Sequence, residues 1–141
     1  MMKKTGSSLS YLLISIFLLT NSSYAFNHIS EDDLASNSIA SEVEQAFLEI
    51  GYITEAAAYA IPAKGGEGME DEVMIALMLN KNTNIEHSNL LTKAKINLAK
   101  FAIPKYIRIM DQFPKTATGK VQKNKLREEG ITLDTWQNPD L

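Results

Sequence analysis

The sequence contains no cysteine. This absence excludes disulfide bridges, thiolate nucleophiles and zinc sites built on cysteine, so an ordinary hydrophobic core must stabilise the fold. Histidine is scarce as well. The two histidines, His28 and His87, have no His or Cys partner at the spacing that metal ligands require, so we expect no metal site.

An excess of one charge is also absent. The chain carries 14 Lys and Arg residues against 17 Asp and Glu residues, a formal net charge of −3. Such a chain has no overall field that draws it to nucleic acid or to an anionic membrane, so any anion-binding site must be local. The 45% hydrophobic content, with seven Gly and four Pro among 141 residues, is typical of one globular domain.

The N-terminal hydrophobic run is too short to span a membrane stably. It covers Tyr11–Leu19, nine residues, whereas a transmembrane helix needs about 20. Lys3 and Lys4 precede it, and Ser23-Tyr24-Ala25 follows it with the small-x-small pattern of signal peptidase sites. Residues 1–25 are thus predicted to be a cleaved signal peptide, which implies a periplasmic or secreted protein. The alternative is a fortuitously hydrophobic leader on a cytoplasmic protein.

A helix is predicted after a polar linker. Residues 26–38 are polar and show neither helical nor strand periodicity, as is typical of a linker. Ser41 and Glu44 form an S-x-x-E capping box, in which the serine accepts from the N3 amide and the glutamate reaches back to the cap amide. The helix should therefore begin there, and Gly51 is a natural stop. Its apolar face consists of Ile39, Val43, Ala46, Phe47 and Ile50.

Three segments are predicted to be strands. Residues 52–61 are rich in short apolar side chains, and residues 73–79 are apolar at every position, as in a central strand covered on both faces. Residues 106–110 alternate between apolar and polar side chains. The glycine-containing connection 63–72 is too short for a helical crossover, so the first two strands should pair antiparallel.

Two further helices complete the prediction. One ends before Pro104, and the other is a short charged helix over residues 123–129. The order of elements predicts an α+β fold, a small sheet of about three strands covered by helices. Residues 137–141 are predicted to be a tail. The helix that ends before Pro104 has four apolar positions at helical spacing, Leu91, Ala94, Leu98 and Phe101. The predicted core consists of Val43, Phe47, Ile61, Val73, Ile75, Leu77, Leu91, Leu98 and Phe101.

The strongest candidate for a functional segment is basic. Between Lys115 and Arg127 there are five cations and no acid, around a turn-forming T-x-T-G-K sequence. These cations could form a local anion site, although composition alone favours a solvated basic turn. It is not a Walker loop, because Pro114 and Val121 occupy positions that require Gly and Ser or Thr. No aromatic residue lies within the segment to stack on bases, so we expect no nucleic-acid partner.

The same segment resembles a known family. Residues 100–132 (KFAIPKYIRIMDQFPKTATGKVQKNKLREEGIT) resemble the end of an adenylate-forming acyl-CoA synthetase: an AKF-x-x-P-x-Y stretch, the P-K-T-x-T-G-K lysine motif and a basic helix. SEVEQAFLEI, AAAYAIP and G-E-x-x-x-D-E-V resemble earlier parts of the same C-terminal AMP-binding-enzyme domain, so the resemblance covers residues 39–136. The ending 126–136 (LREEGITLDTW) most resembles carnitine/crotonobetaine–CoA ligases.

The resemblance implies a lid over a larger ATP-binding domain, where ATP and a carboxylic acid form an acyl-adenylate that coenzyme A intercepts. Lys120 matches the catalytic lysine of the family, which would stabilise negative charge at the α-phosphate. Thr118, Gly119, Lys115 and Lys123 are the implied cofactor-binding residues. The two lysines among them would position the loop or contact coenzyme A phosphates, or lie on the surface without such a role. ATP and coenzyme A are implied for the complete enzyme, and we expect neither to bind this domain alone.

The sequence also departs from the family pattern. The basic glycine-containing loop and the hinge that lead into this domain are replaced by Leu34-Ala35-Ser36-Asn37-Ser38, and no phosphate loop precedes residue 39. We therefore expect an isolated lid domain with a possible partner, a separately encoded N-terminal AMP-binding domain. Two alternatives remain, a non-catalytic exported module or truncated-gene remnant, and a small anion-binding domain. The family's acyl pocket belongs to the larger domain, so the sequence indicates no acyl substrate, and it indicates no oligomeric state.

The predicted signal peptide is directly testable. A C-terminally tagged protein expressed in a bacterium should appear in the periplasmic fraction, shortened by the 25 residues of the leader, in a mass measurement of the intact protein. Full-length protein found in the cytoplasm would contradict export.

Overall fold

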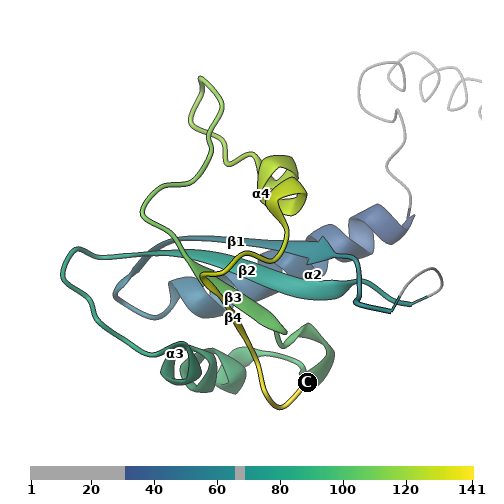
Figure 1. Ribbon diagram of the computed structural model, residues 1–141, viewed down its shortest axis with the longest axis horizontal. Helices are drawn as coiled ribbons and strands as arrows, with labels where there is room; N and C mark the ends of the chain where they lie inside the picture. The colour runs from purple at the N-terminus through teal and green to yellow at the C-terminus, as the bar shows by residue number, and fades with distance from the viewer. Residues whose placement is uncertain (1–30, 66–68) are drawn as a thin grey trace, which may run out of the picture. The chain divides into compact units, whose positions relative to one another are not determined.

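A four-stranded mixed sheet organises residues 35–141 of the computed structural model (Figure 1). The structure describes residues 31–65 and 69–141, so the predicted signal peptide, the first part of the predicted linker and the centre of the glycine-containing connection lie outside the described residues. The strands lie in the order β1-β2-β3-β4, where β1–β2 and β3–β4 are antiparallel and β2–β3 are parallel. The strand bounds are β1 Ile53–Ile61, β2 Glu72–Leu79, β3 Tyr106–Ile109 and β4 Thr135–Gln137.

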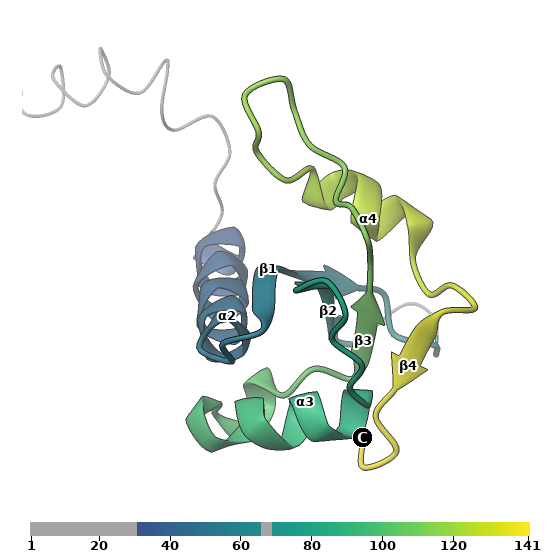
Figure 2. The same ribbon diagram turned by 90° about the vertical axis from the view of Figure 1, so that its left-hand side faces the viewer.

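Helices cover both faces of the sheet (Figure 2). α2 (Glu31–Leu48) and α3 (His87–Ala94) lie on one face, and α4 (Lys123–Glu129) lies on the other. β2 supports both layers, because its alternate side chains enter two different hydrophobic clusters: Ile75 and Leu77 pack under α2 and α3, while Met74 and Ala76 pack with Leu126 of α4. The predicted α+β class and the antiparallel pairing of the first two strands are confirmed.

The first helix begins earlier than predicted. α2 starts at Glu31, so the second part of the predicted linker, residues 31–38, is helical. Ser41 lies within the helix, where its hydroxyl donates to the carbonyl of Asn37 (2.9 Å), and it is therefore not an N-cap. The prediction gave too much weight to the S-x-x-E pattern. No Gly or Pro interrupts residues 31–48, and the acids at 31–33 favour a helix N-terminus there. The predicted buried face is correct.

The second helix ends earlier than predicted. α3 stops at Ala94 and is followed by two short 3₁₀ turns, Lys95–Asn97 and Lys100–Ala102. This break changes the direction of the later side chains, so Phe101 is 72% exposed and its assignment to the core is wrong. Leu98 still packs against the core from a partly buried position.

A fourth strand was not predicted. Trp136 of β4 lies opposite Ile107 of β3, and its indole stacks on the imidazole of His87 with ring centroids 5.8 Å apart. Burial lowers the pKa of His87, so the neutral ring is favoured in this stack. The predicted tail 137–141 begins inside the strand, and Asn138 is buried, with its backbone N–H donating to the carbonyl of Lys105 (2.8 Å). Among the described residues, no helix has both the length and the apolar character needed to cross a membrane.

The different burial of Phe47 and Phe101 predicts that alanine substitution at the two sites lowers stability by very different amounts. Phe47→Ala should lower the free energy of unfolding by about 3–5 kcal/mol, because the Phe47 side chain is fully buried against the sheet. Phe101→Ala removes the same atoms from an exposed site and should change stability by less than about 0.5 kcal/mol. Urea denaturation measures both, and equal effects would contradict the assigned faces.

Candidate functional site: a lysine hairpin

The predicted basic segment forms a hairpin between β3 and α4. We call residues 114–122 the lysine hairpin. At its base, the amide of Gln122 donates to the carbonyl of Pro114 (2.8 Å), and Lys115 pairs with Val121 as an isolated antiparallel bridge. Figures 1 and 2 show that the segment between β3 and α4 extends away from the sheet. The hairpin is therefore an arm with its own backbone hydrogen bonds.

The tip of the hairpin is shaped by the T-x-T-G-K sequence. The amide of Thr116 donates to the carbonyl of Lys120 (2.8 Å), and the amide of Gly119 donates to the carbonyl of Thr116 (2.9 Å). Gly119 has a φ of +86°, a backbone conformation that L side chains adopt at a cost. The Thr116 hydroxyl accepts from the Lys120 amide (3.1 Å) and lies 3.1 Å from the Thr118 hydroxyl. The threonines and the glycine thus define the turn on which Lys120 sits.

The cations of the segment have different surroundings. Lys115 forms an ion pair with Glu55 (2.7 Å), and Lys123 forms one with Glu44 (2.5 Å). Lys120 is exposed and forms no ion pair with the residues that the structure describes. Of the predicted site residues, four lie together on the hairpin, and Lys123 begins α4 directly after it. Of the three lysines among the predicted site residues, only Lys120 lacks a carboxylate partner in the described part of the chain.

α4 fixes the C-terminal end of this segment to the sheet. The Arg127 Nε donates to the carbonyl of Ala60 in β1 (3.0 Å). Leu126 of α4 and Phe113, which precedes the hairpin, are buried in the same hydrophobic cluster as Tyr59 and Tyr106. Both ends of the lysine hairpin are therefore fixed to the body of the domain by apolar packing.

Charged groups surround the end of α4. Arg108 of β3 pairs with Glu129 (2.5 Å) and Asp134 (3.1 Å), which ties α4 and the following loop to the sheet. Hydrogen bonds from Thr132 and Arg108 lower the pKa of Asp134, so it stays ionised. Burial raises the pKa of the nearby Tyr59 to about 12, so this phenol stays neutral at physiological pH. These groups stabilise the fold beside the hairpin.

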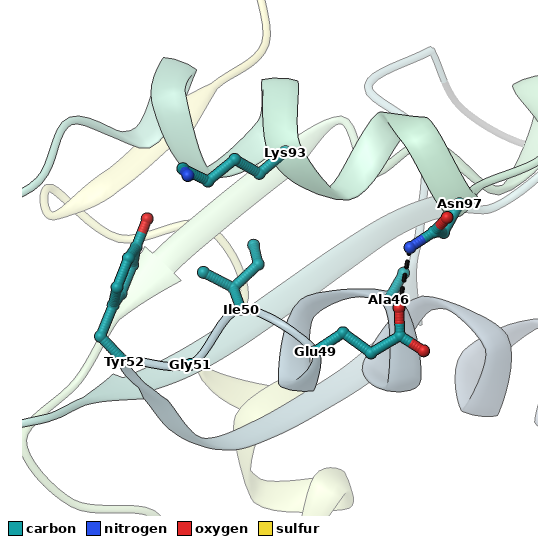
Figure 3. Close-up of a pocket in the computed structure, with 7 residues that line it drawn as sticks. All are labelled: Ala46, Glu49, Ile50, Gly51, Tyr52, Lys93 and Asn97. Carbon is teal, nitrogen blue, oxygen red and sulfur yellow. Dashed lines mark hydrogen bonds between the residues drawn. The ribbon is translucent and has the colours of Figure 1, made fainter.

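A pocket that was not predicted lies elsewhere. It has a volume of about 310 Å³ and lies between the end of α2, the start of β1 and α3 (Figure 3). The Asn97 amide donates to the Glu49 carboxylate (2.7 Å) at one side of it, while Lys93 and Tyr52 lie at the other. None of the predicted site residues lines this pocket. Within residues 31–65 and 69–141, no three His, Asp or Glu side chains cluster closely enough to hold a metal ion.

Several known proteins with similar sequences are named as CoA ligases. The chain is 33% identical over 98 residues to the peroxisomal trans-cinnamate:CoA ligase of Petunia hybrida, a match that covers 69% of this chain and 16% of that protein. It is 33% identical over 87 residues to the 2-succinylbenzoate–CoA ligase of Listeria monocytogenes, covering 62% of this chain and 18% of the relative. The chain therefore spans about a sixth of the length of these curated relatives.

Solved structures give the same relationship. Apo MatB from Rhodopseudomonas palustris matches with a TM-score of 0.58 and 29% identity, over 64% of this chain and 17% of that one. An acyl-CoA synthetase from Brucella canis matches with a TM-score of 0.56 and 26% identity, over 64% and 17% of the two chains. The sequence profile described as the AMP-binding enzyme C-terminal domain matches residues 42–120, more than half of the chain and ending at Lys120. The chain belongs to the family of AMP-binding enzyme C-terminal domains.

Proposed function

We propose that this domain is the lid of an ATP-dependent acyl-CoA ligase, and that Lys120 is its adenylation lysine. The observation that carries this proposal is the position of Lys120 at the exposed tip of the lysine hairpin, without an ion-pair partner among the described residues, while Lys115 and Lys123 are paired. The relatives are named as CoA ligases, which supports the same reaction class.

The proposed reaction explains why a single exposed lysine is useful. A carboxylate oxygen of the acid attacks the α-phosphorus of ATP, a new P–O bond forms, and the bond to the departing pyrophosphate breaks. Negative charge increases on the oxygens around that phosphorus, and an ammonium group placed against them stabilises the transition state more than the ground state. Coenzyme A then displaces AMP from the acyl-adenylate. Thr118 and Gly119 lie beside Lys120 on the turn, where they would contact the phosphate or keep the lysine in place.

The complete reaction requires a second protein surface. Alignment of ATP and the acid contributes about 7–11 kcal/mol to the lowering of the barrier, and one mobile lysine does not align them. We propose that a separate N-terminal AMP-binding domain supplies this surface and binds ATP, coenzyme A and the acid. The ending at residues 126–136 supports, as the finer proposal, an enzyme of the carnitine/crotonobetaine–CoA ligase type.

The predicted leader supports a second function. If residues 1–25 direct export, the domain reaches a compartment where ATP and coenzyme A are scarce, and it acts there as a non-catalytic module. In the further alternative, a small anion-binding domain, the Lys120 and Lys125 side chains would bind the anion, because both are exposed and neither is ion-paired within the described region.

The lysine proposal is tested by complementation. The chain alone should catalyse no ATP–pyrophosphate exchange. Added to the Listeria 2-succinylbenzoate–CoA ligase truncated before its own C-terminal domain, or fused to it to raise the effective concentration, it should restore acyl-adenylate formation. Lys120→Ala should then lower the rate by about 10²–10³, the size of effect seen when one oxyanion-stabilising donor is removed.

Two controls make the result specific. Lys125→Ala removes an exposed cation from α4 and should leave the restored rate within about twofold, whereas Lys123→Ala should reduce it less than Lys120→Ala does. Turnover by the chain alone would refute the requirement for a second domain. Restoration that is indifferent to Lys120 would remove this lysine from its proposed role.

A further inference from the structure

At Thr54, the alternation of β1 side chains between the two faces of the sheet is interrupted. Ile53 lies opposite Leu79, and both pack in the core under α2 and α3. The next paired residue is Glu55, opposite Met78, which packs in the cluster under α4. In a regular strand, residues 53 and 55 share a face, so Thr54 is the extra residue of a β-bulge. The Thr54 hydroxyl donates to the carbonyl of Met78 (3.2 Å) and fixes this irregularity.

The bulge directs Glu55 toward the lysine hairpin. The Glu55 carboxylate pairs with Lys115 at 2.7 Å, and the two side chains are 32% and 36% exposed. Lys115 is the residue that bridges to Val121 at the base of the hairpin. Without the extra residue in β1, position 55 would face α2 and α3, away from this lysine.

Glu44 makes the corresponding contact at the start of α4, directly after the second strand of the hairpin. Its Oε1 accepts the amide of Ala58 (2.8 Å), a group at the open edge of β1. The same oxygen pairs with Lys123 at 2.5 Å, where the hairpin joins α4. The Ala58 amide at the edge of β1 has no partner in the sheet and is therefore free to donate to Glu44. This hydrogen bond orients the carboxylate that also pairs with Lys123. α2, β1 and α4 thus meet at one carboxylate.

We propose that Glu44 and Glu55 are positioning residues that clamp the lysine hairpin. Glu55 holds the first strand of the arm through Lys115, and Glu44 holds the start of α4, directly after the second strand, through Lys123, so the arm cannot rock freely and Lys120 is presented in one direction. The clamp also neutralises the two flanking cations. The link to catalysis rests on the proposed function of Lys120, whereas the clamp itself is a property of this chain.

The absence of native cysteine makes the clamp measurable in the full chain. A nitroxide attached through Ala117→Cys, at the exposed tip, reports the motion of the hairpin in an electron paramagnetic resonance spectrum. Glu55→Gln and Glu44→Gln should each increase the mobile population by about 1.5- to 5-fold, the range expected when a partly exposed ion pair is lost. Glutamine is nearly the same size, so the fold should persist, as circular dichroism would verify.

Matched controls distinguish increased motion of the lysine hairpin from destabilisation of the whole domain. Glu128→Gln removes a carboxylate from α4 that forms no ion pair within the described region, and it should leave the spectrum unchanged. A label at Asn89→Cys on α3 should not respond to any of the variants. The charge exchange of Glu55→Lys with Lys115→Glu should restore the low mobility. Unchanged mobility of the tip in both glutamine variants would overturn the clamp.

An activity measurement separates this inference from the function on which it rests. In the complementation assay, Glu44→Gln and Glu55→Gln should lower kcat and leave the KM for ATP nearly unchanged, because they alter the direction of Lys120 and not the ATP-binding surface. Failure of the unaltered chain to complement would refute the adenylation role and leave the spectroscopic result intact. A spectroscopic response without any change in kcat would refute the catalytic consequence of the clamp.

Discussion

The open edge of β1 imposes the constraint on which the arrangement of this domain depends. Among the described strands, β1 pairs only with β2, so the backbone groups along its other side need partners from outside the sheet. Glu44 of α2 accepts from the Ala58 amide, and Arg127 of α4 donates to the Ala60 carbonyl. Both helices are thereby fixed relative to the same strand, on opposite faces of the sheet. The lysine hairpin ends at α4, so its position follows from how that edge is satisfied.

Local patterns predicted the elements whose burial is strong and regular. The apolar run of β2 and the helical spacing of Val43 and Phe47 were sufficient, because a fully covered strand and one buried helix face leave clear periodicities. The start of α2, the break after Ala94 and the existence of β4 were not predicted. β4 has only three residues and depends on pairing with β3 and on contact between Trp136 and His87, which are tertiary effects.

The candidate site also combines a feature that local sequence encodes with contacts that it does not. The T-x-T-G-K sequence encodes its own turn through local hydrogen bonds and one positive φ, so the turn that carries Lys120 could be predicted from the sequence. The partners of Lys115 and Lys123 could not be found in this way. Glu55 precedes Lys115 by 60 residues, and its direction depends on a bulge that has no distinctive sequence. Glu44 was predicted to cap its own helix, whereas its carboxylate contacts a strand and another helix. A local pattern cannot express a contact between elements so distant in sequence.

The surroundings of the three lysines suggest why one type of C-terminal domain occurs in enzymes that act on different carboxylic acids. The relatives are named for substrates as different as trans-cinnamate and 2-succinylbenzoate, although they match similar shares of this chain, 69% and 62%. A lysine that acts on the α-phosphate needs no contact with the acyl group. It needs a fixed direction, which in the proposed clamp would come from Glu44, from Glu55 and from the backbone edge of β1. Because none of these contacts involves the acid, the same arm is compatible with any acyl pocket that presents the α-phosphate in the same place.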